Sequence, residues 1–325
     1  MYRLAADIFN DTAMVLDCLS PVFPKAARIA VLSFSSCLRA LCGVCAGSAK
    51  ASLSAHFAKR GNLGEVNAKD SSQETVISLL GMLAGSFVVG QITSPGATWC
   101  TLLFLLSMHL GTNYAAVRAV SMQVLNRQRA NILFSNLFQQ GVVLSPNEVS
   151  ARERIFERDG VLRWADGRVL GRCRIGVSLD ELLGQLGPRH QQSGSVAMHA
   201  IDVSDLLSVF QAERYILWPA SPAYEALIVL KAGCGPIDQL KAWAHALLVA
   251  ERGQRRRDRG LMGKPDGAAA GAAQHRHAHL VAELRETLGL VGTMFDKYGE
   301  AMKSKGWDFE AVALETQAGM RLHVS

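Results

Sequence analysis

The sequence predicts a mainly α-helical protein, in which a membrane-associated helical bundle is followed by a small soluble α+β domain. The first observation is that residues 76–117 contain no Asp, Glu, Lys or Arg. Only 19% of the whole chain is charged, against roughly 25% in ordinary soluble proteins. The second is that residues 1–140 contain 11 Lys and Arg against 6 Asp and Glu, a pattern that suits anionic headgroups. The third is that segments beyond residue 142 become short and turn-bounded, which is typical of strands.

These patterns divide the chain into three parts. We expect a helical membrane-associated domain over residues 1–142 and an α+β domain made of residues 143–251 and 280–325. Residues 252–279 are rich in Ala, Gly and Arg, a composition that favours a low-complexity insertion over a packed segment.

The first domain is predicted to consist of helices. Residues 3–19 have amphipathic spacing, and residues 25–50 form a long small-residue helix. An apolar hairpin follows over residues 76–111, with its turn at Ser94-Pro95-Gly96. Each arm is near the lower limit of about 17–20 residues for crossing hydrocarbon, so the hairpin is expected to span or re-enter a membrane. One further helix is expected from Asn113 to Gly141.

Two pairs of glycines are candidates for close helix packing. Gly43 with Gly47, and Gly81 with Gly85, are each four residues apart. This GxxxG spacing leaves a bare patch on one helix face and lets another helix approach. Close packing within a soluble bundle is the alternative.

The stretch HFAKRGNLGEVNAKDSSQETV, residues 56–76, is the most polar part of the first third of the chain. Ser71 and Glu74 have the spacing of a capping box directly before the apolar run, so we expect a helix to start there. The remaining basic residues would then lie beside free backbone N–H groups and form a potential anion site. The binding candidates in this stretch are Lys59, Arg60, Lys69, Asp70, Gln73 and Glu74.

Four other residues are candidate binding groups. His109 and Asn113 share one face of an apolar helix, where polar groups mark either a functional pathway or a helix–helix hydrogen bond. Arg127 and Arg129 could hold a phosphate or carboxylate, or they could anchor the chain at a membrane edge.

The second domain contains recognisable start signals. Ser145-Pro146-Asn147-Glu148 is a capping box with proline at the first helical position. Further helices are expected over residues 236–251 and from residue 280 to residue 302. Strands are expected in the segments GVLRWA, GRVLGRCRIGVS, AMHAIDV, RYILWP, EALIVLKAG and EAVALET.

No constellation in the sequence predicts catalysis. The seven cysteines include Cys42 and Cys45 in a CxxC, but neither a redox turn nor a second pair for zinc accompanies them. The tract His275-Arg276-His277-Ala278-His279 lies in the expected insertion, where a solvated linker is favoured over a metal site. We therefore predict no enzyme activity, cofactor or metal, and, lacking a basic stripe with aromatics, no nucleic-acid partner.

Several long segments resemble the root UVB sensitive (RUS) family. The stretch at residues 56–76 resembles the hallmark of that family, and ADIFNDTAMVLDCLSPVFP, HLGTNYAAVRAVSMQVLNRQRAN, YILWP and LKAWAHALL agree in order. The resemblance covers most of residues 4–250. It implies family sequence upstream of the ADIFND segment, so we expect an N-terminally truncated member.

The resemblance implies a membrane-associated protein without known catalytic residues. Plant members of the family are tied to UV-B responses, auxin transport and vitamin B6 homeostasis through protein partners. A partner is therefore expected, either a pyridoxal-phosphate enzyme or another RUS-family protein, at an intracellular membrane of a plastid, the endoplasmic reticulum or a mitochondrion. The alternative is a membrane carrier or binding protein for a small anionic solute such as a B6 phosphate.

Overall fold

The computed structural model describes residues 2–58, 61–154, 157–186, 203–220, 225–259, 270–314 and 321–322. They form two compact units, unit 1 with residues 1–120 and 154–156, and unit 2 with residues 121–153 and 157–325. The boundary predicted from the sequence lies at residue 142. The structure places β1 (Val124–Asn126) and α5 (Arg127–Gln140) in unit 2, because buried side chains of both belong to its hydrophobic core.

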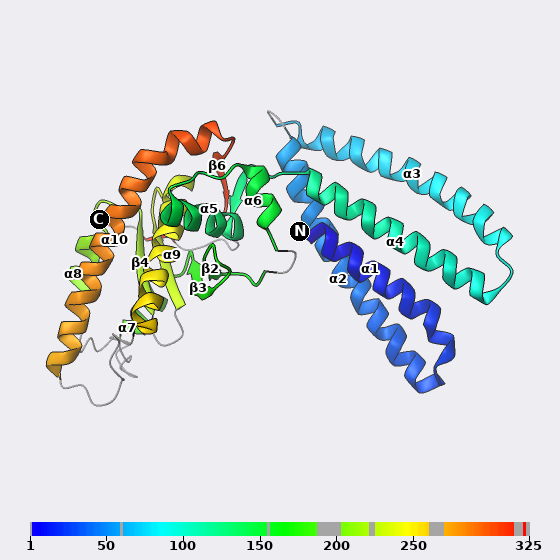
Figure 1. The fold of residues 1–325 in the computed structure, drawn as a ribbon, viewed down its shortest axis with the longest axis horizontal. Coiled ribbons are helices and arrows are strands. Elements are labelled where there is room, and N and C mark those ends of the chain that lie inside the picture. Colours follow the sequence, from blue (N-terminus) through cyan, green and yellow to red (C-terminus); the bar gives the residue numbers. More distant parts are fainter. Residues whose placement is uncertain are drawn as a thin grey trace. The chain divides into compact units, whose positions relative to one another are not determined.

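Unit 1 consists of two antiparallel helical hairpins (Figure 1). Its elements are α1 (Tyr2–Leu19), the 3-10 turn η1 (Ser20–Val22), α2 (Lys25–Phe57), α3 (Leu63–Gln91) and α4 (Pro95–Ala119). The expected turn of the second hairpin is confirmed. The Ser94 hydroxyl accepts a hydrogen bond from the Ala97 N–H at 3.2 Å, and Pro95 occupies the first turn of α4, where its missing N–H costs nothing.

The predicted helix start at Ser71 is wrong. α3 already begins at Leu63, preceded by Gly61 in the left-handed region at φ 81°, so the DSSQE stretch lies inside a continuous helix. The hydroxyls of Ser72 and Thr75 donate to the carbonyls of Ala68 and Ser71 one turn back, at 2.8 and 2.9 Å. These side chains are satisfied within the helix, and they do not cap it.

The continuous helix predicted from Asn113 to Gly141 is also wrong. α4 ends at Ala119, the strand β1 follows, and α5 begins at Arg127 with Asn126 as its N-cap. The Asn126 Oδ1 atom accepts a hydrogen bond from the Arg129 N–H at 2.9 Å. The interruption depends on tertiary pairing, because β1 is held by the distant strand β6 (Asp308–Ala313) in a parallel ladder.

A mixed sheet forms the centre of unit 2. Its strands are β2 (Val161–Arg163), β3 (Val169–Ile175), β4 (Tyr215–Ala220), β5 (Glu225–Lys231) and β7 (Arg321–Leu322). Their order is β2-β3-β5-β4, with β7 also paired to β5. The β3–β5 and β5–β7 pairs are parallel, and the β2–β3 and β4–β5 pairs are antiparallel.

Helices complete the core of unit 2. They are α5, α6 (Pro146–Arg152), α7 (Leu179–Leu186), α8 (Val203–Val209), α9 (Pro236–Asp258) and α10 (Ala270–Ser304). The capping box at Ser145 is confirmed. The predicted strands are confirmed except AMHAIDV, which lies outside the described residues apart from Val203 at the start of α8.

The expected low-complexity insertion is partly helical. Residues 252–258 continue α9, and residues 270–279 begin α10. Two ion pairs fix these ends, because Arg252 pairs with Glu286 at 2.9 Å and Arg256 pairs with Glu283 at 2.8 Å. The His275–His279 tract accordingly lies in the helix α10.

Candidate functional site

The described binding candidates of the polar stretch before the apolar hairpin all lie on α3. Lys69 pairs with Glu65 on its own helix at 2.8 Å. Lys50 of α2 pairs with Asp70 at 3.0 Å and with Glu74 at 2.7 Å, so these carboxylates join α2 to α3. Gln73 is exposed on α3. Lys59 and Arg60 lie outside the described residues.

The two candidate arginines are occupied inside unit 2. The Arg127 Nε atom donates to the Leu314 carbonyl at 2.7 Å, and its guanidinium pairs with Asp159 and lies over the Trp243 ring. Arg129 pairs with Glu153, of which the side chain is only 4% exposed, and donates to the Val124 carbonyl at 2.9 Å. Both arginines therefore hold β1 and its surroundings together.

The predicted pair of His109 and Asn113 lies at a contact between α1 and α4. The His109 Nδ1 atom lies 3.1 and 3.2 Å from the two carboxylate oxygens of Asp11. The Asn113 amide donates to the His109 carbonyl one turn back, at 3.1 Å. His109 thus makes a helix–helix hydrogen bond, which is one of the two alternatives that the sequence left open.

The structure brings further charged residues to this place. Asp7 lies one turn before Asp11 on α1, and both residues are less than 10% exposed. Arg3 approaches Asp7 at 3.9 Å, and Asp17 farther along α1 pairs with Arg39 of α2. The sequence predicts an amphipathic helix over residues 3–19, but it does not connect these aspartates to His109. The available signal was the four-residue spacing of Asp7 and Asp11 together with a lone histidine in an apolar helix.

The candidate packing glycines face open space in this chain. A Cβ atom added at Gly43, Gly47, Gly81 or Gly85 would meet no other described atom within 4 Å. The described part of the chain therefore supplies no close neighbour for either GxxxG face, and their packing role stays a prediction. Cys42 and Cys45, on the same helix as Gly43 and Gly47, are half-buried.

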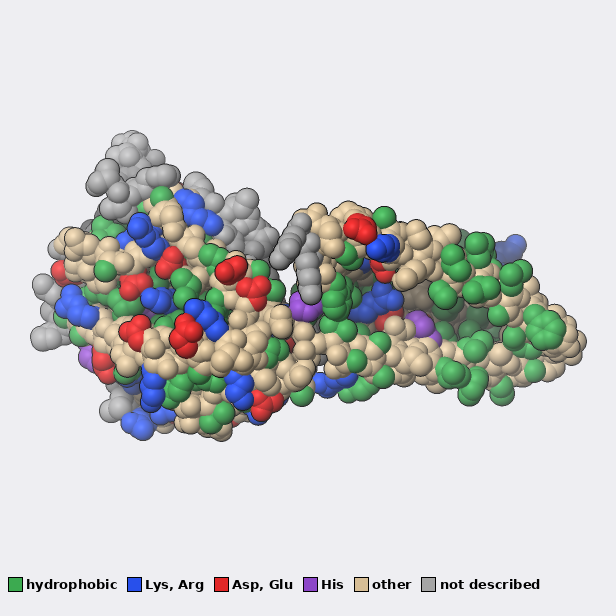
Figure 2. All heavy atoms as spheres, turned by 90° about the horizontal axis from the view of Figure 1, so that it is seen from above, with side chains coloured by type: hydrophobic (Ala, Val, Ile, Leu, Met, Phe, Trp, Pro, Cys, Tyr) green, Lys and Arg blue, Asp and Glu red, His purple; other side chains and the backbone are tan. Residues whose placement is uncertain are grey.

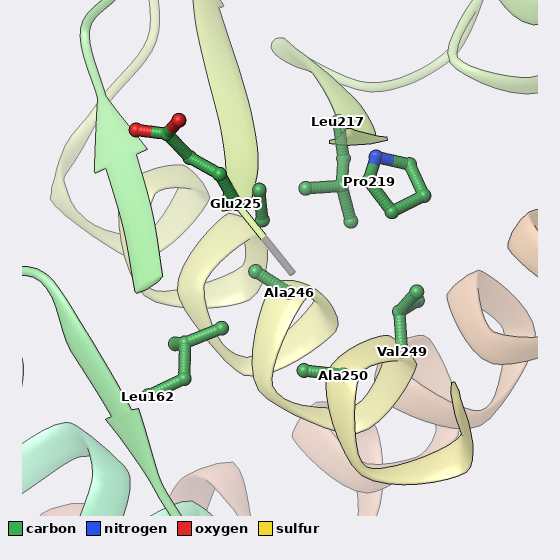
Figure 3. A pocket seen from close by; sticks show the side chains of 8 residues that line it. Leu162, Leu217, Pro219, Glu225, Ala246, Val249 and Ala250 are labelled. Atoms are coloured by element: carbon green, nitrogen blue, oxygen red, sulfur yellow. The ribbon is translucent and has the colours of Figure 1, made fainter. Parts of the chain in front are cut away.

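An apolar void lies between the sheet and α9 of unit 2. Figure 3 shows Leu162, Leu217 and Pro219 on the strands facing Ala246 and Val249 on α9, with the Glu225 carboxylate directed away. Its accessible volume is only about 10 Å³. It presents no convergent polar groups of the kind that orient a substrate.

A buried polar network of unit 2 is centred on His245 of α9. Its Nδ1 atom lies 3.1 Å from the Tyr215 hydroxyl and its Nε2 atom lies 2.8 Å from the Thr287 hydroxyl. Burial lowers the pKa of His245 to about 3 and raises the pKa of Tyr215 well above its ordinary value. Neither group reaches the apolar void, because neither belongs to its lining.

Unit 1 has a largely apolar surface. Among the described residues, three helices are long and apolar enough to cross a membrane, namely α2, α3 and α4. No residue of α3 or α4 is buried. Figure 2 shows hydrophobic side chains gathered along the helices of unit 1, while charged side chains are spread over unit 2.

Fold and site together define a class of protein: an apolar helical unit with an internal charged cluster, joined to a small α+β unit. In the described part of the chain, no group of three or more His, Cys, Asp and Glu side chains could hold a metal ion.

Residues 1–141 match the model of the vitamin B6 photo-protection and homoeostasis domain, and residues 169–318 match the C-terminal domain of root UVB sensitive proteins. The chain belongs to the root UVB sensitive family.

Relatives agree with these matches. The chain is 34% identical over 259 residues to protein root UVB sensitive 3 of Arabidopsis thaliana, covering 77% of this chain and 54% of the relative. It is 40% identical over 158 residues to RUS family member 1 of Dictyostelium discoideum, covering 47% and 30%. It is 23% identical over 249 residues to protein root UVB sensitive 2, chloroplastic, of Arabidopsis, covering 76% and 52%. The chain spans about half the length of its Arabidopsis relatives, and no solved structure matches it.

Proposed function

We propose that this chain is a non-catalytic membrane protein, in which α2, α3 and α4 cross an intracellular membrane and unit 2 binds a protein partner. The observation that carries the membrane part is the exposure of apolar side chains on α3 and α4. Leu83 is 70% exposed, Phe87 71% and Phe104 63%. Such a continuous apolar surface is unfavourable in water and favourable in lipid.

The dimensions of the helices support this proposal. α3 has 29 residues and α4 has 25, which at 1.5 Å per residue corresponds to lengths of about 43 and 37 Å. The hydrocarbon core of a bilayer is about 30 Å thick. Two charged residues within α2 also have partners, since Arg39 pairs with Asp17 and Lys50 pairs with Asp70 and Glu74.

Carbonate extraction of membranes from cells that express the full chain tests this part. We expect the chain to stay in the membrane pellet. Leu83→Arg should move a large share of the chain to the supernatant, because an arginine at the centre of a spanning helix costs at least about 2.5–3.5 kcal/mol.

The matched control is Leu290→Arg, which changes an exposed leucine on α10 of unit 2. It should leave the pelleted fraction unchanged. Release of the unaltered chain by carbonate would contradict membrane embedding, as would equal behaviour of the two arginine variants.

The partner part of the proposal concerns the surface of unit 2. Its described interior offers only the apolar void, so a role in binding would fall to its outer face. We infer that the partner is another RUS-family protein or a pyridoxal-phosphate enzyme. Through it the chain would serve the vitamin B6 homeostasis, UV-B response and auxin transport that the family resemblance implies. Affinity purification of the tagged full chain from native membranes tests this, and absence of both candidate partners would contradict it.

A carrier for a small anionic solute such as a B6 phosphate is the second candidate. The exposed polar stretch and His109 are its binding groups. The described ion pairs argue against it, because Lys50 and Lys69 are neutralised by carboxylates and His109 faces Asp11. Saturable uptake of pyridoxal phosphate into proteoliposomes, reduced by replacing His109 or Lys69, would favour the carrier over the partner-binding protein.

A further inference from the structure

We propose that Asp7, Asp11 and His109 form a proton-binding site where α1 docks on α4, and that the bound proton resides on Asp7. The two aspartates lie one turn apart on the same face of α1. His109 reaches this face from α4 and contacts both oxygens of Asp11. The site therefore holds two neighbouring carboxylates, of which Asp11 contacts the histidine.

The unpartnered carboxylate oxygen of Asp7 carries this inference. Asp7 is 7% exposed, and its Oδ2 atom is buried with no hydrogen-bond partner. Its other oxygen lies 3.9 Å from the Arg3 Nε atom, which is beyond hydrogen-bond distance. A buried charge without a donor is costly, and uptake of a proton removes that charge.

Asp11 is in a different position. Both of its oxygens lie within hydrogen-bond distance of the His109 ring, so its negative charge is compensated. Two neighbouring carboxylates with one compensating group divide their roles, one staying ionised and the other taking the proton. The geometry assigns the ionised role to Asp11 and the protonated role to Asp7.

The groups around Asp7 come from three helices. Arg3 and Asp11 face it from α1, His109 from α4 and Cys42 from α2, with Cys45 beside Cys42. Burial raises the pKa of Asp7, Arg3 and His109 oppose that shift, and Asp11 adds to it. The Asp17–Arg39 pair is a separate contact between α1 and α2.

A proton fits this site better than a metal ion. No group of three His, Cys, Asp and Glu side chains with metal-binding geometry occurs among the described residues, whereas a proton needs only one carboxylate lone pair. Loss of the proton would place a second negative charge inside the contact. The site therefore makes docking of α1 on α4 dependent on pH.

Infrared spectroscopy of the full chain in lipid nanodiscs tests the proposal, with the C=O band of protonated carboxyl groups followed as pH is varied. We expect a band that persists above the ordinary aspartate pKa of about 3.9. Asp7→Asn should remove this band. Asp17→Asn, which changes the aspartate of the neighbouring ion pair, should leave it in place. Circular dichroism confirms that each variant is folded.

Two further measurements do not depend on a variant of Asp7. Asp11→Asn should lower the pH at which the band titrates, because it removes the neighbouring negative charge. Replacing choline by sodium at constant ionic strength should not move that pH. Persistence of the band in Asp7→Asn, an unchanged titration in Asp11→Asn, or a sodium-dependent shift would each overturn the assignment of a proton on Asp7.

Discussion

At the scale of single residues, the tautomer of His245 follows from its hydrogen-bond partners. The Thr287 hydroxyl donates to the Glu283 carbonyl at 2.7 Å, so it must accept from the His245 Nε2–H. The His245 Nδ1 atom is then the acceptor for the Tyr215 O–H. Protonation of Nδ1 would replace this acceptor by a second donor in a fully buried site.

This arrangement predicts that unit 2 loses stability in acid. His245 has a pKa of about 3 in the folded chain, against 6.5 for an ordinary histidine. The unfolded state therefore binds the proton more tightly than the folded state does. The contribution of neutral His245 to the unfolding free energy is complete above pH 6.5 and is lost as pH falls toward 3. The full difference corresponds to at most about 5 kcal/mol of unfolding free energy.

Urea unfolding followed by tryptophan fluorescence measures this effect, because four of the five tryptophans are in unit 2. His245→Gln should flatten the dependence of the unfolding free energy on pH in that range. The control His279→Gln changes an exposed histidine and should keep the slope of the unaltered chain. Identical slopes in both variants would refute the neutral buried histidine.

At the scale of elements, the start of α3 can be tested with proline. If the helix began after Ser71, residue 72 would be its first helical position, where proline is tolerated. Because α3 begins at Leu63, Ser72→Pro should break its middle and cost about 3 kcal/mol or more. Circular dichroism should then show a loss of helix and a lower thermal midpoint.

Leu63→Pro is the matched control, since it introduces proline at the first helical position of α3. It should leave the helical signal and thermal midpoint close to those of the unaltered chain. If Ser72→Pro left the helical signal and thermal midpoint unchanged while Leu63→Pro lowered both, the helix would have to begin after Ser71 and not at Leu63.

At the scale of the whole molecule, β6 and Trp307 near the end of unit 2 contact residues near its beginning. β6 pairs with β1, which precedes it by more than 180 residues. Trp307 beside β6 is 4% exposed, and its Nε1 atom donates to the Leu144 carbonyl at 2.7 Å. Unit 2 therefore depends on contacts between its two ends.

Trp307→Ala should lower the unfolding free energy of unit 2 by about 3–5 kcal/mol, because it leaves a cavity and an unpaired carbonyl. Urea unfolding monitored by the remaining tryptophans provides the measurement. Trp99→Ala, on α4 of unit 1, should leave the transition of unit 2 unchanged. If Trp307→Ala lowered the unfolding free energy by less than about 1 kcal/mol, that would contradict the role of Trp307 in joining the two ends of unit 2.

Local patterns were sufficient for many elements. The hairpin turn at Ser94, the capping box at Ser145 and the strands β4 and β5 follow from residues close in sequence. Local signals failed at Ser71, because its capping-box spacing lies inside the longer helix α3. They also failed at residues 120–126, where a short strand exists only because β6 pairs with it.

The sequence by itself determined the apolar helices, most turns and the family of this protein, because these depend on the order of neighbouring residues. Only the tertiary structure decided which charged residues meet. Asp11 and His109 are 98 residues apart in sequence, and Arg127 contacts the Leu314 carbonyl from 187 residues away. Such contacts depend on how distant helices and strands pack. The proton-binding site proposed at Asp7 therefore follows from the packing of α1 against α4.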